Sequence, residues 1–172
     1  MADDNPMREI RVEKVVINIG VGEAGEKLAR AARVIELLTG QKPIQTLSKT
    51  TNKEWGIRKK MPIGVKATLR GKRAEDFLKR AFWVKDFKIM GYSFDQEGNF
   101  SFGISDYTDF EGMKYDPEIG IFGMDISVTL SRPGRRVSLR RRKRSRVGRK
   151  HRLNPEIAKR FLKEKFNVEV VE

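Results

Sequence analysis

The stretch Ile63-Gly-Val-Lys-Ala-Thr-Leu-Arg70 alternates apolar and polar side chains with a period of two. This period is typical of a strand with one face on a core and the other in water or on a ligand. Three further segments alternate in the same way, namely Ile10–Ile19, Phe100–Ile104 and Met124–Leu130. A run from Pro43 to Ser48 is compatible with an edge strand, where proline is tolerated. The chain is therefore expected to form a sheet that is apolar on one face only.

Three helical segments can cover that apolar face. Glu26–Thr39 has a helical apolar stripe and is followed by Gly40, a residue favoured after helix ends. Lys72–Lys88 has a broad apolar face, and Asn154 with Pro155 reads as an N-cap and a first helical residue. The stripe expected in the last helix is Ile157, Phe161 and Phe166.

These elements predict an α+β fold, with helices on one face of a mixed, mostly antiparallel sheet and the other face open. We expect an α+β domain over residues 8–131. A basic C-terminal extension over residues 132–172 is expected to end in a short helix. Side chains expected on the open face are small and polar or cationic: Lys14, Asn18, Lys66, Thr68, Arg70, Ser101, Ser127 and Thr129.

The charge of the chain is concentrated in two segments. The 172 residues carry a formal net charge of +14, and Ser131–Leu153 alone holds twelve Lys or Arg without an acid. Lys42–Arg73 holds ten more against the single acid Glu54. No folded core can bury so many unpaired cations, so these segments are either solvated loops or a surface for a polyanion. Basic segments on both sides of a polar sheet face favour nucleic acid over the ordinary solvated face of an antiparallel sheet.

Several classes of function are disfavoured by the residues. The chain has no cysteine, which excludes disulfides and thiolate zinc sites, and its apolar runs are too short for a membrane span. The N-terminus does not resemble a signal peptide, so a soluble cytoplasmic protein is expected. No metal or cofactor is expected, because the acids between Asp106 and Asp125 do not have EF-hand spacing.

Two patterns resemble catalytic motifs but are better explained otherwise. Gly20-Val-Gly22-Glu-Ala-Gly25 has the spacing of a dinucleotide-binding turn, yet Glu23 would repel a pyrophosphate and no ribose-binding acid follows. His151, the only histidine, has no acid near it in the sequence to orient it as a catalytic base. No enzyme is expected.

The two tryptophans have different interpretations. Trp55 lies in the basic loop Lys49–Lys60, where it could equally stack on nucleic acid or fold back onto the core. Trp83 stands beside Phe82 in a predicted helix and is expected to pack in the interior.

Particular strings of the sequence resemble a known family. They are Arg11–Gly22 (RVEKVVINIGVG), Leu38–Pro43 (LTGQKP), Pro62–Gly71 (PIGVKATLRG) and the start of the strand at Gly123 (GMDISVT). In this order and spacing they are similar to large-subunit ribosomal protein five, a universal family that binds 5S ribosomal RNA (rRNA). The C-terminal part, from Arg132 to Arg152, resembles the archaeal and eukaryotic branch of that family.

The resemblance implies a helix-backed sheet and a ribosomal function without catalysis. It implies 5S rRNA contacts at Lys14, Asn18, Gln41, Thr68 and Asp125, to which the polar-face pattern adds Lys66 and Arg70. A basic loop would face the P-site transfer RNA (tRNA) through Lys53, Trp55, Arg58, Lys59 and Lys60. The C-terminal cations would bind rRNA through Arg135, Arg136, Arg140, Arg141, Arg142, Lys143, Arg144, Arg146, Arg149, Lys150 and Arg152.

The implied partners are 5S rRNA, large-subunit rRNA, P-site tRNA and neighbouring large-subunit proteins, with no membrane. Tyr107–Gly120 would face a small-subunit head protein across the intersubunit bridge. The alternative from the residues alone is a nuclear or nucleoid protein that uses the Arg-rich run as a localisation signal or a DNA-binding arm.

Overall fold

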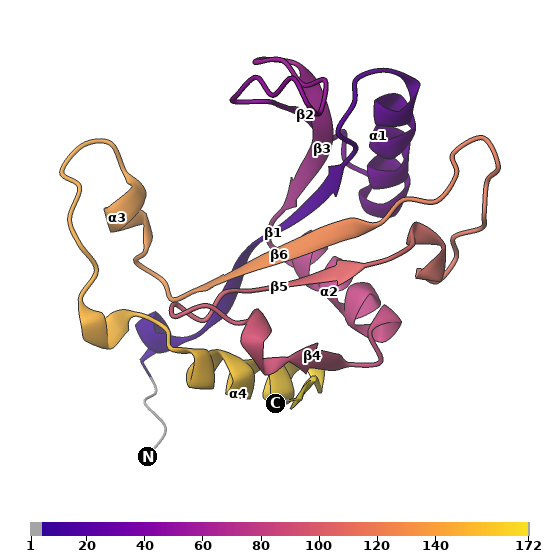
Figure 1. The fold of residues 1–172 in the computed structure, drawn as a ribbon. Coiled ribbons are helices and arrows are strands. Elements are labelled where there is room, and N and C mark those ends of the chain that lie inside the picture. The colour runs from indigo at the N-terminus through magenta and orange to yellow at the C-terminus, as the bar shows by residue number, and fades with distance from the viewer. Residues whose placement is uncertain (1–4, 172) are drawn as a thin grey trace.

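The computed structural model describes residues 5–171, and its centre is a twisted five-stranded sheet (Figure 1). Every neighbouring pair in this sheet is antiparallel, and the strand order is β2-β3-β1-β6-β5. The strands are β1 (Arg11–Gly20), β2 (Ile44–Leu47), β3 (Pro62–Leu69), β5 (Phe100–Ile104) and β6 (Met124–Ser131). All five predicted strands are therefore confirmed, and β2 is an edge strand as expected.

The longer helices are α1 (Glu26–Thr39), α2 (Lys72–Val84) and α4 (Pro155–Phe166). In Figure 1, α2 lies behind the sheet and α4 runs below its lower end, next to β4 (Lys88–Met90). β4 pairs in parallel with β7 (Glu169–Val171) to form a second, two-stranded sheet. The remaining elements are α3 (Arg136–Leu139) and the 3₁₀ turns η1 (Pro6–Arg8), η2 (Gly91–Ser93), η3 (Tyr107–Asp109) and η4 (Arg149–His151). The predicted α+β class is confirmed.

The helix ends differ in part from the prediction. Helix α1 stops at Gly40, whose φ of 64° is left-handed and whose N–H donates to the Glu36 carbonyl, as the glycine indicated. Helix α2 was expected to reach Lys88 but ends at Val84, because Asp86 and Phe87 adopt positive φ values of 50° and 56° and turn the chain into β4. Three-residue strands give too little periodicity to be distinguished from the end of an apolar helix.

Of two predictions of packing, the one for α4 was confirmed in part and the one for Trp83 was wrong. In α4 the buried side chains are Ala158, Leu162 and Phe166, whereas Ile157 and Phe161 are only half-buried. The buried residues follow the four-residue spacing of one helix face, which lies next to the expected stripe. Trp83, which was expected to be buried, is 53% exposed on the outer side of α2. Asn154 occupies the N-cap position of α4 as predicted, although its side chain forms no capping hydrogen bond.

The core lies between the apolar sheet face and the helices. The three central strands contribute side chains that are fully buried, with 0% of their surface exposed: Val15, Ile17, Val65 and Ile126. Aromatic rings extend this core toward the C-terminus, where Phe82 of α2 lies 6.2 Å from Phe100 of β5 and 5.4 Å from Phe166 of α4 (ring centroids).

Helix α4 is thus part of the same core as the sheet. Between β6 and α4, the chain leaves the core over residues 132–152, which we call the basic arm. The predicted boundary between a domain and an extension, near residue 131, stays a prediction. Among residues 5–171 no helix is long and apolar enough to cross a membrane.

Candidate nucleic-acid interface

The open face of the sheet carries aligned rows of polar side chains. In the strand register, Asn18 of β1 stands opposite Lys66 of β3 on one side and Asp125 of β6 on the other. Helices cover the opposite face, so these three side chains remain accessible: Lys66 and Asp125 are exposed and Asn18 is half-buried. The row places an ammonium, an amide and a carboxylate across three neighbouring strands, at the spacing of paired strands.

A second row runs next to the first. Val16 of β1 stands opposite Thr68 of β3 and Ser127 of β6, and Ser127 in turn pairs with Ser101 of β5. Beyond it Lys14 pairs with Thr129. The two rows offer hydroxyls, an amide and cations on a shallow surface, which suits contacts to phosphates, base edges and 2′-hydroxyl groups of RNA.

Two paired glycines lie at one end of this face. Gly20 and Gly64 stand opposite each other, and Gly64 also pairs with Thr46 of β2. A Cβ atom at Gly64 would lie 2.8 Å from Thr46 Oγ1 and 2.9 Å from the Ile19 carbonyl oxygen. Only glycine fits there without displacing a neighbour. Gly64 is itself buried, so the missing side chain at this position lets Thr46 pack directly against β3.

Of the seven residues predicted to contact 5S rRNA, four lie on these two rows, Lys14 lies next to the second row, and two lie elsewhere. Arg70 follows the end of β3, and its Nη1 donates to the Glu13 carbonyl at 3.4 Å, where β1 has a bulge next to Lys14. Gln41 lies in the turn between α1 and β2, where its N–H donates to Thr39 Oγ1 at 3.2 Å. The structure therefore brings Arg70 close to the row of Lys14, whereas Gln41 belongs to a loop at the end of the sheet.

The basic loop between β2 and β3 is an ordered hairpin. Asn52 and Ile57 exchange two backbone hydrogen bonds of 2.8 and 2.9 Å, and Lys60 N–H donates to the Ser48 carbonyl at 2.9 Å. Trp55 lies at its tip and is 73% exposed, so it is not folded onto the core. All five side chains predicted for this loop are exposed: Lys53, Trp55, Arg58, Lys59 and Lys60.

The basic arm folds into a closed loop at one side of the sheet (Figure 1). Its outgoing and returning halves are joined by contacts such as the hydrogen bond of Ser145 N–H to the Val137 carbonyl, at 3.2 Å. In another, His151 Nε2 lies 2.8 Å from the Pro133 carbonyl oxygen. Arg135 connects the arm to the rest of the fold, with Nη1 3.5 Å from Glu13 Oε2 and Nη2 3.8 Å from Glu97 Oε2.

The eleven predicted cations of the arm fall into two groups. One group donates to backbone carbonyls of the arm or of β6: Arg135, Arg140, Arg144 and Arg152. Arg132, which was not among the predicted cations, donates in the same way to the Lys150 carbonyl. The other predicted cations are exposed: Arg136, Arg141, Arg142, Lys143, Arg146, Arg149 and Lys150. Sequence reasoning did not foresee this division, because a carbonyl acceptor is present only once the loop has closed.

The patterns that resembled other sites have local explanations. Gly22 and Gly25 have φ values of 82° and 127°, which glycine adopts without strain, so the glycine-rich turn is a tight connection from β1 to α1. Carboxylates of the 106–120 segment bind their own backbone, with Asp116 Oδ1 accepting from Glu118 N–H at 2.9 Å. Within residues 5–171, no three His, Cys, Asp or Glu side chains are grouped closely enough to hold a metal ion.

Comparison with known proteins agrees with the resemblance read from the strand motifs. The family profile described as ribosomal protein L5 matches residues 5–58, and the profile described as the C-terminus of the same ribosomal family matches residues 62–169. The chain is 53% identical over 169 residues to large ribosomal subunit protein uL5 of Sulfurisphaera tokodaii, an alignment that covers 98% of this chain and 96% of the relative.

Two further relatives bear the same name. The uL5 protein of Thermoplasma acidophilum is 54% identical over 168 residues, covering 97% of this chain and 99% of the relative. That of Picrophilus torridus is 55% identical over 169 residues, covering 98% and 96%. With both profiles matched in order and relatives of this identity along nearly the whole chain, the protein belongs to the ribosomal protein L5 family, in its archaeal-type branch.

Proposed function

We propose that this chain binds 5S rRNA in the large ribosomal subunit and helps to form the central protuberance. Family membership supplies the coarser statement: the chain is a structural, non-enzymatic constituent of the large ribosomal subunit, and it works in the cytoplasm. The observation that carries the finer proposal is the row formed by Lys66, Asn18 and Asp125, on a sheet face that no helix within residues 5–171 covers.

The row supports recognition rather than simple attraction. Lys66 can neutralise a phosphate, and the Asn18 amide can both donate and accept a hydrogen bond. Asp125 would be repelled by phosphate, so it selects a partner that donates, such as a base amino group or a 2′-hydroxyl group. A carboxylate in a row that also holds a cation disfavours arbitrary polyanions and favours an RNA with a donor at the matching position.

A nucleoid or nuclear DNA-binding protein with an Arg-rich arm is the alternative function. The two are separated by competition: unlabelled duplex DNA of equal length should displace labelled 5S rRNA from the wild-type chain at least about a hundredfold less effectively than unlabelled 5S rRNA. Equal displacement by the two competitors would contradict the proposal and favour the DNA-binding alternative.

The hairpin between β2 and β3 is proposed to face P-site tRNA. An exposed indole among cations can stack on a base while the cations neutralise the neighbouring phosphates. Trp55→Ala should weaken tRNA binding to reconstituted large subunits about fivefold or more, since stacking on a base contributes about 1–3 kcal/mol. Thermal unfolding should hardly change, because Trp55 is 73% exposed.

Trp83→Ala is the matched control for this hairpin. It removes the other tryptophan, which is 53% exposed on α2 behind the sheet. Equal tRNA affinity of wild type and Trp55→Ala, or an equal loss in both variants, would exclude stacking by Trp55.

The segment Tyr107–Gly120 is proposed to contact a small-subunit head protein. It leaves the sheet on the side opposite to the basic arm (Figure 1) and carries exposed acids, among them Asp109, Glu111 and Glu118. An acidic surface suits the basic proteins common in ribosomes. In reconstituted ribosomes, crosslinks from Lys114 should include a small-subunit protein, and crosslinks confined to the large subunit would contradict this assignment.

A further inference from the structure

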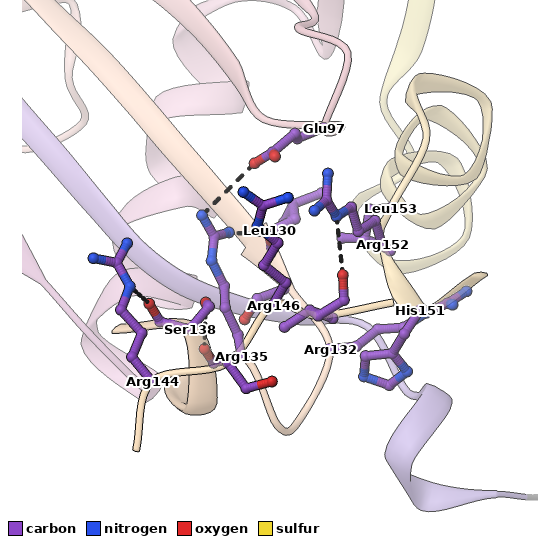
Figure 2. Close-up of a pocket in the computed structure, with 13 residues that line it drawn as sticks. Glu97, Leu130, Arg132, Arg135, Ser138, Arg144, Arg146, His151, Arg152 and Leu153 are labelled. Atoms are coloured by element: carbon purple, nitrogen blue, oxygen red, sulfur yellow. Dashed lines mark hydrogen bonds and ion pairs between the residues drawn. The ribbon is translucent and has the colours of Figure 1, made fainter. Parts of the chain in front are cut away.

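The basic arm encloses a cavity of about 560 Å³ that the proposed sheet-face contacts do not use. Figure 2 shows the side chains around it, which come from both halves of the arm, from the end of β6 and, at the rim, from Glu97 between β4 and β5. We call it the arm cavity. Its volume lies within the usual range of small-molecule sites, about 300–1,000 Å³, and is larger than a single phosphate group needs.

The lining of the arm cavity is strongly cationic. Five arginines stand against one carboxylate, that of Glu97: Arg132, Arg135, Arg144, Arg146 and Arg152. Three serines add hydroxyl groups: Ser131, Ser138 and Ser145. A concave surface of one sign concentrates the field inside it, so the cavity attracts an anion with hydrogen-bond acceptors.

The cationic groups of the cavity are incompletely paired. Arg135 approaches Glu13 and Glu97 at 3.5 and 3.8 Å, whereas a charge-assisted hydrogen bond between a guanidinium and an anion measures about 2.7–2.9 Å. The Nε atom of Arg132 is buried and has no hydrogen-bond partner among the described residues 5–171. Buried donors in folded proteins are normally bonded, so these two side chains retain capacity for an anionic acceptor.

Hydrogen bonds within the arm and two buried leucines support the walls of the cavity. Ser145 N–H bonds the Val137 carbonyl at 3.2 Å, and the Arg152 Nε donates to the Val147 carbonyl at 3.3 Å. Leu130 and Leu153, both buried, attach the two ends of the arm to the core. When a binding loop is already held in shape, less conformational entropy is lost on binding, and the affinity for the ligand is higher.

We propose that the arm cavity binds one nucleotide unit of an unpaired RNA strand, with its backbone phosphate among the guanidinium groups. The proposal rests on the RNA-binding function above and adds a second, distinct contact. Guanidinium groups match the geometry of phosphate oxygens and can also stack on a base. The same arm also carries exposed cations outside the lining, such as Arg141, Arg142 and Arg149, and these attract a chain of phosphates rather than a single free ion.

A steric variant tests the cavity without changing the charge. Ser145→Trp places an indole in the lining, whereas Leu139→Trp places the same indole on the arm at a residue that is 63% exposed and outside the lining. In fluorescence anisotropy with a labelled 5S rRNA transcript, Ser145→Trp should bind about tenfold more weakly, and Leu139→Trp should stay within about twofold of wild type. Equal affinities in the two variants would overturn the proposal.

A second pair of variants tests the cavity without a bulky substitution, in case Ser145→Trp disrupts the structure of the arm. Arg146→Gln and Arg141→Gln each remove one charge from an exposed arginine, and only Arg146 lines the cavity. A larger loss for Arg146→Gln supports the cavity, and an equal loss overturns it.

Ethylation of RNA phosphates before binding gives the position of the contact. One or two adjacent ethylated phosphates should block binding to wild type but not to Ser145→Trp, and the same interference pattern in both would overturn the proposal. Displacement of the RNA from wild type, but not from Ser145→Trp, by millimolar inorganic phosphate would show a site for free phosphate instead. These readouts compare variants on one RNA, whereas the proposed function fails when wild type shows no preference for 5S rRNA over competitors, so the two failures are distinguishable.

Discussion

Combining Asn18→Ala with Thr68→Lys should lower the affinity for 5S rRNA about a hundredfold while leaving the affinity for competitor RNA unchanged or slightly higher. Asn18 occupies the centre of the first polar row, and Ala removes its amide. Thr68 lies in the second row, where a lysine would project from a surface that RNA must approach closely. Loss of two or three hydrogen bonds at about 1 kcal/mol each, together with the steric block, amounts to about 3 kcal/mol.

The sign of the charge change makes this variant informative. Thr68→Lys adds a cation, so a surface that acts only through electrostatic attraction would bind every RNA more tightly. The matched control combines Gln45→Ala with Leu37→Lys, which also removes an amide and adds a cation. Gln45 pairs with the inward-facing Val65, and Leu37 is exposed on α1, so both lie off the open face. The control should bind 5S rRNA at least as well as wild type. Equal losses of affinity in both variants would contradict the claim that the polar rows recognise 5S rRNA.

Neutralising the exposed cations of the basic arm should reduce the salt dependence of binding and preserve its selectivity. The variant carries glutamine at Arg136, Arg141, Arg142, Lys143 and Arg149, none of which lines the arm cavity. If each contacts one phosphate, the slope of log K against log salt should become about 4 units shallower, because each neutralised phosphate contributes about 0.7–0.9. Affinity near physiological salt should then fall by orders of magnitude.

A control with the same change of charge separates contact from general attraction. Glutamine replaces five cations of the helical layer and the small sheet: Arg33, Lys79, Lys85, Lys88 and Lys163. Its slope should change by less than about 1 unit, because these side chains lie off the open face and outside the arm. An unchanged slope in the arm variant would mean that the arm contacts something other than RNA, and a loss of preference for 5S rRNA would place recognition in the arm.

The strands could be predicted because their pattern is local. Alternation in Ile63–Arg70 and Met124–Leu130 fixes which face is apolar, and pairing of these strands around β1 then determines which polar residues meet. To predict the row of Lys66, Asn18 and Asp125 from sequence, one needs both the period of each strand and the register between neighbouring strands. Period alone placed Lys66 and Asn18 on the open face and Asp125 opposite the apolar residues of its strand, and the resemblance added Asp125 as an RNA contact.

What could not be predicted depends on contacts between distant residues. The pairing of Met90 with Val171 joins two three-residue strands, each too short to show a period. Arg135 contacts Glu13 and Glu97, which are far from it in sequence, and a run of arginines does not reveal which of them will bond carbonyls. The arm cavity has no signal in the sequence beyond its charge.

Directed hydroxyl-radical probing tests the central claim, that the open sheet face lies against 5S rRNA. The chain has no cysteine, so Ser101→Cys on β5 and Trp83→Cys on α2 each provide one attachment site for an iron chelate. The account predicts that the chelate at residue 101 cleaves a short, defined stretch of bound 5S rRNA and that the chelate at residue 83 does not. Strong cleavage from residue 83, with none from residue 101, would contradict it.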